Sequence, residues 1–271
     1  RPLTADLRSD QRDILCEALR LLQAMVDVIS SSGWLRPALA AMELSQMIVQ
    51  ARWASDDGLL QVPHFTKDIV ARLHEFHQNR SRDEEDEDDE DEEFGVMDLM
   101  DLEDDERDKL LQLTPSQMSD VASFCNAYPN VEFSFEVIDA DAVTAGDVVE
   151  VMVRLERDMD EDETAAVAAA GGQQVFAPNY PKGKNEGWWV VVGNQDTNTL
   201  LSISRVAITR PKQGVKLTFV APETTGKHEL SIFLMCDSYL RCDQEYPLEL
   251  QVGEGESDSE TDGDASDSDS D

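Results

Sequence analysis

Apolar side chains recur with helical spacing through the first half of the chain. Between residues 10 and 29 they fall three and four positions apart, which predicts a helix buried on one face. Gly33 ends this helix, and Pro37 fits the first turn of a second helix that runs to about Trp53. A third helical pattern follows. We therefore predict that three helices pack together in residues 1–79, as the carboxy-terminal part of a helical bundle.

A run of acids separates this region from a second helical one. Residues 83–93 are eleven consecutive acids, which repel one another and offer nothing apolar to bury. Residues 80–95 are therefore expected to form a disordered acidic insert. Residues 96–128 then show short helical pieces, and Thr114 begins the sequence of a capping box. This second region is predicted to be a helix-loop-helix.

The period of the apolar pattern changes from 3.6 to 2 after the helical half. Short runs of alternating apolar and polar residues predict seven strands over residues 129–252. Their number and length indicate a β-sandwich of immunoglobulin or fibronectin type III-like build. Residues 159–172 are acidic and then rich in Ala and Gly, which suggests a long hairpin loop. The predicted fold class is α+β, with a disordered acidic tail at 253–271.

Charge limits the kinds of partner that the chain can attract. Acidic residues outnumber basic ones by 58 to 22, which gives a formal net charge of −36. Twenty of the acids lie in two stretches, eleven at 83–93 and nine from Gly253 onward. The rest of the chain still carries −16, so even its folded part repels phosphate on average. We therefore expect no RNA or DNA binding driven by counterion release from this chain alone.

The composition also indicates a cellular setting. Four cysteines without a C-x-x-C pair favour a reducing compartment, the cytosol or nucleus, over a secreted domain. Polar residues interrupt every apolar run, so no segment is predicted to span a membrane. The chain begins at Arg1 without an initiator Met or a signal-like segment, and we interpret it as a piece of a longer protein.

The sequence contains no recognised catalytic motif. The G-x-x-x-x-G-K-[ST] phosphate loop is absent, so this segment is not expected to hydrolyse ATP. His74 and His77 could begin a metal site, but no third or fourth ligand follows at a suitable spacing. Cys236 and Cys242 could form a redox pair, but their spacing and the apolar strand around Cys236 favour core packing. No catalytic residue, cofactor or metal is predicted for this segment.

Two groups of residues are candidates for an interaction surface. Basic residues collect in the sandwich half of an otherwise acidic chain, and folding could place some of them on one face as a docking patch for an acidic partner. Trp188 and Trp189 are adjacent on a predicted strand, so one ring should point inward and the other outward, where it could anchor an interface. The candidate residues are Trp188, Trp189, Lys182, Lys184, Arg205, Arg210, Lys212 and Lys216.

The acidic tail carries hydroxyl residues in contexts that acidophilic kinases favour. Phosphorylation there would deepen the negative charge of the tail. An unmodified, solubilising tail is the alternative interpretation. The candidate phosphorylation sites are Ser257, Ser259, Thr261, Ser266, Ser268 and Ser270.

Several motifs along nearly the whole chain resemble one known family. They resemble the carboxy-terminal unit of the tandem-cassette RNA helicases of the spliceosomal U-five small nuclear ribonucleoprotein, most closely the second cassette. The endoplasmic-reticulum translocon J-protein shares this unit. The resemblance implies a helical bundle, a helix-loop-helix and an immunoglobulin-like domain, in the order that the periodicities predict. The motifs are Gly33-Trp34-Leu35-Arg36-Pro37, Leu60-x-x-Pro63-His64-Phe65, Leu110-Leu111-Gln112-Leu113, Tyr128-Pro129-Asn130, Glu186-Gly187-Trp188-Trp189, Phe219-Val220-Ala221-Pro222 and Cys242-Asp243-Gln244-Glu245-Tyr246.

The resemblance also implies a function. The parent protein would use ATP and Mg to unwind RNA in the nucleus. This segment would be a non-catalytic platform for splicing factors and for the helicase cassettes of the same chain. In catalytic cassettes of the family, the central bundle helix lines the RNA path and presents a basic residue two turns before a Trp. These positions are Gln46 and Trp53 here, and the missing charge implies that RNA is bound through the parent chain rather than by this segment.

Two other functions fit the composition. A segment of the translocon J-protein would require transmembrane helices and a J-domain upstream. A free acidic chaperone for basic proteins such as histones would act through the acidic run and the tail. Deletion of these acidic segments would abolish binding of a basic partner only if the chain is such a chaperone.

Overall fold

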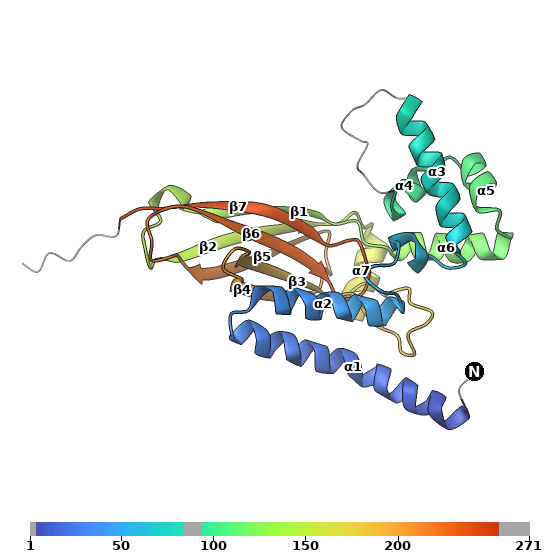
Figure 1. Cartoon of the computed structure of the whole chain (residues 1–271), viewed down its shortest axis with the longest axis horizontal. Coiled ribbons are helices and arrows are strands. Elements are labelled where there is room, and N and C mark those ends of the chain that lie inside the picture. The colour runs from blue at the N-terminus through green and yellow to red at the C-terminus, as the bar shows by residue number, and fades with distance from the viewer. Residues whose placement is uncertain (1–3, 84–93, 255–271) are drawn as a thin grey trace, which may run out of the picture.

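The computed structural model describes residues 4–83 and 94–254, and its architecture is α+β (Figure 1). Two antiparallel sheets form one part of the molecule, two long helices lie along them, and a group of shorter helices sits at one end. The acidic residues 84–93 and the tail from residue 255, with its candidate phosphorylation sites, lie outside the described residues. The predicted α+β class is confirmed.

The two sheets contain the seven predicted strands in antiparallel pairs. One sheet has the order β1-β2-β5 and the other has the order β4-β3-β6-β7. The fourth strand therefore pairs with the third rather than joining the sheet of the first. Alternate residues of β2 are buried, as expected for a strand with one face in the core. The strands are β1 (Glu132–Ile138), β2 (Val148–Glu156), β3 (Trp188–Asn194), β4 (Thr199–Val206), β5 (Lys212–Val220), β6 (Gly226–Cys236) and β7 (Gln244–Val252).

Helices α1 (Ala5–Ser31) and α2 (Leu35–Gln50) pack side by side against the four-stranded sheet (Figure 1). Gly33 connects them with a φ of +71°, which glycine adopts without steric cost. Met42 of α2 is fully buried and packs in one cluster with Trp189 of β3. The sheet thus has a helical layer over the face that does not meet the other sheet.

The third helix does not join α1 and α2 in one bundle, which differs from the prediction for residues 1–79. It packs with α5 and with the short 3-10 helix η1, and Figure 1 shows it beside α4 and α6. Helix α2 packs Met42 against the sheet, whereas Ile69 and Leu73 of α3 belong to the larger apolar cluster, which the shorter helices share with the sheets and with Leu19, Leu22 and Val49 of α1 and α2. The elements of this group are η1 (Gly58–Gln61), α3 (Lys67–Asp83), α4 (Val96–Asp101), α5 (Asp104–Leu111) and α6 (Pro115–Ala127).

Ordered structure extends into both ends of the predicted acidic insert, residues 80–95. Helix α3 continues to Asp83. Phe94 is only 4% exposed, and its ring lies 5.6 Å from that of His77. Gly95 is the N-cap residue of α4. Charge alone set the predicted boundaries, and it does not reveal that Phe94 is buried between α3 and α4.

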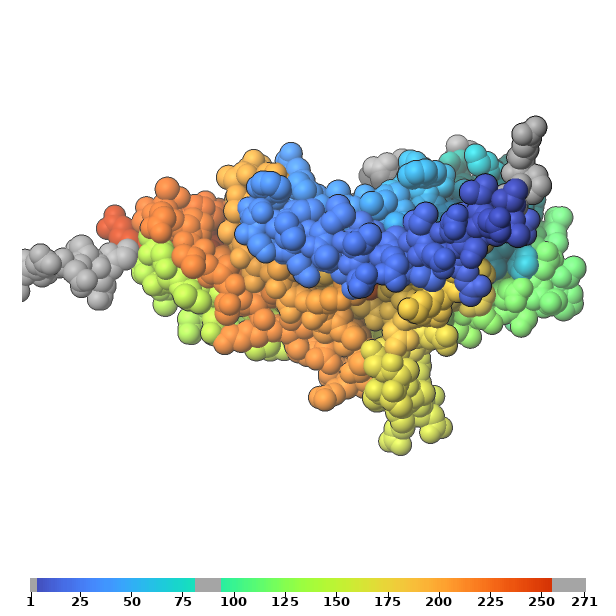
Figure 2. All heavy atoms as spheres, turned by 90° about the horizontal axis from the view of Figure 1, so that it is seen from below, coloured from blue at the N-terminus to red at the C-terminus, as the bar shows by residue number. Residues whose placement is uncertain are grey.

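Residues 159–172, predicted to be a loop, contain helix α7 (Glu161–Ala170). The Asp160 carboxylate caps its first turn by accepting a hydrogen bond from the Glu163 backbone N–H at 2.7 Å. Gly171 ends the helix with a left-handed φ of +75°. The alanines between them favour a helix, but only Val167 is buried, so no apolar period marks it. In Figure 2 this segment projects from the body of the molecule.

Two apolar clusters hold these layers together. The larger runs from the shorter helices into the space between the two sheets. The smaller lies between the four-stranded sheet and the pair α1 and α2. Trp188 belongs to the first cluster and Trp189 to the second, because successive side chains of a strand point to opposite faces. The four-stranded sheet is therefore buried on both faces around β3.

Candidate functional site

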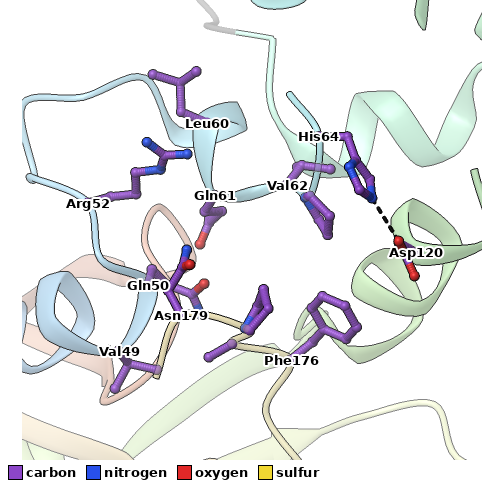
Figure 3. Close-up of a pocket in the computed structure, with 13 residues that line it drawn as sticks. Val49, Gln50, Arg52, Leu60, Gln61, Val62, His64, Asp120, Phe176 and Asn179 are labelled. Carbon is purple, nitrogen blue, oxygen red and sulfur yellow. Dashed lines mark hydrogen bonds and ion pairs between the residues drawn. The ribbon is translucent and has the colours of Figure 1, made fainter. Parts of the chain in front are cut away.

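A cavity of about 330 Å³ lies where the end of α2, the segment after η1, α6 and residues 176–179 meet (Figure 3). Arg52, Gln50 and Asn179 lie along one side of it, and the His64–Asp120 pair closes the other. Pockets that combine an apolar lining with a few polar groups are typical binding sites. The apolar lining comes from Val49, Leu60, Val62, Pro63, Phe176, Ala177 and Pro178.

Two left-handed residues bring the chain to the rim of this cavity. Ala51 ends α2 with a φ of +53°, and its backbone N–H donates to the Met47 carbonyl. His64 has a φ of +66°. Residues with a Cβ enter this region rarely, and such residues cluster at functional sites. The two turns place Arg52 and His64 at one cavity although a 3-10 helix separates them in the chain.

Three contacts fix the far wall of the cavity. His64 Nε2 is hydrogen-bonded to Asp120 Oδ2 of α6 at 2.7 Å. The Phe176 ring packs edge-on against Phe124, with centroids 6.0 Å apart. The Phe176 backbone N–H donates to the Tyr239 hydroxyl at 2.8 Å. The aromatic wall is therefore held by both its ring and its backbone.

Three buried glutamines, which we call the glutamine clamp, attach the β6–β7 turn (residues 237–243) to the helices. Each donates its side-chain N–H to a carbonyl in or beside this turn. Unpaired buried carbonyls are costly, so the clamp satisfies backbone groups that no strand partner reaches. The bonds are Gln46 Nε2 to Cys236 O (2.8 Å), Gln50 Nε2 to Ser238 O (2.8 Å), Gln61 Nε2 to Leu240 O (3.0 Å) and Leu240 N to Gln61 Oε1 (3.1 Å).

Asp243 completes this buried polar junction. Its carboxylate accepts hydrogen bonds from Gln46 Nε2 at 2.7 and 2.9 Å, and from the Cys236 backbone N–H at 2.6 Å. Burial raises the pKa of Asp243 from 3.8 to about 6, although both hydrogen bonds oppose the rise and Glu43 adds to it. Asp243 therefore titrates closer to neutrality than an ordinary aspartate.

The two cysteines of this junction behave as core residues. Burial raises the pKa of the Cys236 thiol and raises that of the Cys242 thiol well above 9.0. A thiol with a raised pKa is a poor nucleophile near neutral pH, because the thiolate is the reactive form. Both side chains are thus suited to packing rather than to redox chemistry.

The structure separates the two residues that the resemblance assigns to the RNA path. Gln46 is 1% exposed and belongs to the glutamine clamp, so its side chain does not face solvent. Trp53 is 70% exposed, just beyond the end of α2. The Gln46 side chain bonds the β6–β7 turn, which the sequence alone does not reveal. An exposed RNA contact at Gln46 is therefore excluded in this structure.

Both tryptophans of the predicted interface are buried. Trp188 is 1% exposed and Trp189 is 3% exposed, so the expectation of one outward ring in solvent is wrong. The α1–α2 layer covers the face on which Trp189 lies. Arg205 lies over the Trp189 ring at 4.3 Å from its centroid, which is a cation–π contact.

The structure brings three of the candidate basic residues, Lys182, Lys184 and Arg205, to one cleft and places the others elsewhere. Lys184 Nζ and Arg205 Nη2 both bind the carboxylate of Asp237, which is fully buried, at 2.5 Å. They line an open cleft together with Lys182 and Arg20. Lys212 and Lys216 lie on β5 and pair with acids of β2, as Lys212–Glu156 and Lys216–Glu150. Arg210 is exposed between β4 and β5.

A second buried acid, Glu186, lies next to this cleft. Its Oε1 binds Arg157 Nη1 at 2.9 Å and accepts from Trp188 Nε1 at 2.6 Å. Burial raises the pKa of Glu186, and the charge of Arg157 opposes the rise. This ion pair, at 7% and 3% side-chain exposure, fixes the start of β3 rather than a surface.

The described residues show neither a metal site nor a membrane span. Residues 4–83 and 94–254 contain no group of three His, Cys, Asp or Glu side chains placed to hold a metal ion. His74 Nε2 instead bonds Asp57 Oδ2 at 2.6 Å. Among the same residues, no helix has both the length and the apolar character needed to cross a bilayer.

Sequence reasoning missed the residues that form the cavity. Arg52, Asn179 and Asp120 lie far apart in the sequence and have no motif in common. The one local signal was Pro63-His64, which the resemblance singled out without a role. The burial of the three glutamines could not be predicted either, because a Gln in a helix usually faces solvent.

Comparison with known proteins decides the family. The model of the Sec63 Brl domain matches residues 2–249. The chain belongs to the Sec63 Brl domain family. This Sec63 Brl domain is 47% identical over 258 residues to the U5 small nuclear ribonucleoprotein 200 kDa helicase of Drosophila melanogaster, and equally to that of Homo sapiens. It is 46% identical over 247 residues to the DExH-box ATP-dependent RNA helicase DExH12 of Arabidopsis thaliana.

The coverage of these matches is one-sided. They include 93%, 93% and 91% of this Sec63 Brl domain, but 10% of each relative. The domain thus spans about a tenth of the length of these helicases and is similar to one segment of them. The resemblance found in the sequence motifs is confirmed.

Proposed function

We propose that this chain is the non-catalytic carboxy-terminal segment of a spliceosomal ATP-dependent RNA helicase, and that it acts in the nucleus as a protein-docking and regulatory platform for pre-mRNA splicing. The similarity to the U5 small nuclear ribonucleoprotein 200 kDa helicase and to an ATP-dependent RNA helicase supports this proposal. ATP and Mg would be bound by the helicase cassettes of the parent chain, and RNA would be held through them. Splicing factors and these cassettes would be the partners.

The exposed face of α1 is the observation that carries the docking role. Leu7, Ile14, Leu21 and Val28 recur every seven residues and are between 52% and 68% exposed. Figure 2 shows α1 lying along the surface of the molecule. A seven-residue apolar repeat is the pattern that packs against another helix. Nine-tenths of each relative lies outside the matched segment, so we assign this face to an apolar helix of the adjoining cassette in the same polypeptide.

Calorimetric titration of this chain with the separately purified adjoining cassette tests the assignment. Leu21→Glu should weaken binding at least tenfold, because a buried unpaired carboxylate is costly. Ser9→Glu adds the same charge at an exposed position of the same helix that lies away from the line of Leu7, Ile14, Leu21 and Val28, and it should leave binding unchanged. Equal effects of the two variants, or no binding by the unaltered chain, would contradict the proposal.

We further propose that the two sheets form an immunoglobulin or fibronectin type III-like sandwich. The 3 plus 4 division of the strands and the core between the sheets support it. The pairing of β4 with β3 favours the fibronectin-like variant, since constant-type immunoglobulin domains put the fourth strand in the other sheet.

A further inference from the structure

The cavity of Figure 3 contains polar groups whose bonding capacity is unused. Within the described parts of the chain, the Arg52 guanidinium makes no hydrogen bond or ion pair, and neither does the Asn179 side chain. Asp120, the one carboxylate of the lining, is hydrogen-bonded to His64 on the side of the cavity opposite Arg52. Arg52 is therefore an unpaired cation at the edge of a cavity in an acidic protein.

An apolar wall faces this cation. Phe176 is fixed by its edge contact with Phe124 and by its backbone bond to Tyr239. Pro63 and Pro178 complete the wall with rings that have little conformational freedom to lose. Rigid apolar surfaces of this kind favour the binding of an apolar side chain, because little entropy is lost on contact.

The frame of the cavity is formed in the free protein. Gln50 and Gln61 line it and are both held by the buried β6–β7 turn. Arg52 follows Ala51, whose left-handed backbone sets the direction in which the chain leaves α2. A site that is built before its ligand arrives avoids the cost of ordering itself on binding.

We propose that this cavity binds an extended peptide of a partner protein in which an acidic side chain stands next to an apolar one. The carboxylate pairs with Arg52 and Asn179, and the apolar side chain covers Phe176. A carboxylate suits a lone guanidinium beside a neutral amide. A nucleic acid is disfavoured, since the chain outside its two acidic stretches still carries −16. The inference rests on the proposed docking function and names one docking site within it.

A peptide array read by fluorescence polarisation tests this site. The probes are blocked, fluorescein-labelled octapeptides in which one Asp or Glu stands next to Leu, Pro or Phe, each paired with its Asn or Gln counterpart. The unaltered chain should bind the best acidic peptides at least tenfold more tightly than their amide counterparts. In Arg52→Ala this preference should disappear, and it should persist in Arg210→Ala, which removes an exposed arginine away from the cavity.

A second variant guards against a folding defect in Arg52→Ala. Asn179→Asp changes an exposed side chain that has no bond to lose, and its charge should repel the peptide and weaken binding at least tenfold. Absence of binding by every acidic peptide, or an acid preference that survives in Arg52→Ala, would overturn the proposal. Arg52→Ala should still bind the adjoining cassette through α1, so loss of the peptide site is distinguishable from loss of the docking function.

Discussion

Gln46, Gln50 and Gln61 each donate a side-chain N–H to a carbonyl at the turn between β6 and β7. None of them is more than 6% exposed. At these positions the amide replaces the water that a surface turn would otherwise bind. Deleting one amide removes a hydrogen-bond partner from a buried backbone group, and the cost of an unsatisfied buried group exceeds the net value of an ordinary hydrogen bond.

Gln61 is the clearest test, because it both donates to and accepts from Leu240. Gln61→Leu should lower the free energy of unfolding by about 2–3 kcal/mol, since the Leu240 N–H and part of its carbonyl capacity lose their partner. Urea denaturation followed by circular dichroism measures the change. Gln11→Leu, at an exposed position of α1, should alter stability by no more than about 0.5 kcal/mol.

Asp243 gives the protein a specific pH dependence. Its pKa rises to about 6 in the folded state, so between about pH 4 and pH 6 the folded chain binds more protons at this site than the unfolded chain. The contribution of Asp243 to stability therefore falls as pH rises through this window. Asp243→Asn removes this titration. As pH rises from 4.5 to 7, the free energy of unfolding of Asp243→Asn should therefore increase by about 1–2 kcal/mol relative to that of the unaltered chain.

Urea denaturation of both proteins at pH 4.5 and at pH 7 measures this change in relative stability. The comparison of the two proteins cancels groups that they share, including Glu186, whose pKa is also raised. A stability difference that is the same at pH 4.5 and pH 7 would show that Asp243 does not titrate in this range.

At the scale of the elements, the contact between α2 and the four-stranded sheet depends on one glycine. A Cβ at Gly193 would lie 2.7 and 2.8 Å from the methyl carbons of Leu35 and 2.9 Å from the Thr199 carbonyl oxygen. Leu35 is fully buried and cannot move aside. Gly193→Ala should therefore lower the free energy of unfolding by about 1–3 kcal/mol.

The matched control is Gly214→Ala in β5. There the nearest atom to a new Cβ, the Val153 carbonyl oxygen, is 4.0 Å away, which is ordinary contact. This variant should be neutral or slightly more stable, because alanine restricts the unfolded chain. A similar loss in both variants would indicate a general cost of side chains in these strands rather than the α2 contact.

The strands and most helices could be predicted because their apolar periods are local. The alternation in β2 and β5 follows from one buried face and needs no knowledge of the partner sheet. Helix α7 was not predicted because it buries few side chains and so shows no apolar period, although Asp160 and Gly171 are cap signals in the sequence. The burial of Trp189 could not be predicted, since it depends on a helical layer from a distant part of the chain.

At the scale of the whole molecule, the charge of −36 governs long-range encounters. A fluorescent 12-nucleotide oligouridine should show no saturable binding below about 100 μM protein at 0.15 M salt, because few phosphates can be neutralised. Trp53→Ala should not change this result, although Trp53 is the exposed aromatic residue nearest the cavity in sequence. Tight binding that is lost in Trp53→Ala would restore an RNA-path role for the end of α2.

The candidate site could not be predicted from the sequence because it is assembled from distant parts of the chain. Its lining combines residues 49–64 with Asp120 and residues 176–179, which only the complete fold brings together. The grouping of basic residues could not be predicted for a related reason. Lys182, Lys184 and Arg205 meet at one cleft, where Lys184 and Arg205 share the buried Asp237, and a count of charges along the chain reveals neither the grouping nor this pairing.

The glutamine clamp also joins parts of the chain that the ribosome makes at different times. Gln46 and Gln50 lie 190 and 188 residues before the carbonyls that they bind. A ribosome adding about 5–20 residues per second reaches those carbonyls roughly 10–40 s after it makes α2. During that interval α2 has its glutamines and apolar residues, but the four-stranded sheet that covers them is incomplete. The face of α2 that is buried in the finished protein is therefore exposed during translation. We expect this face to need protection from aggregation until the four-stranded sheet is complete.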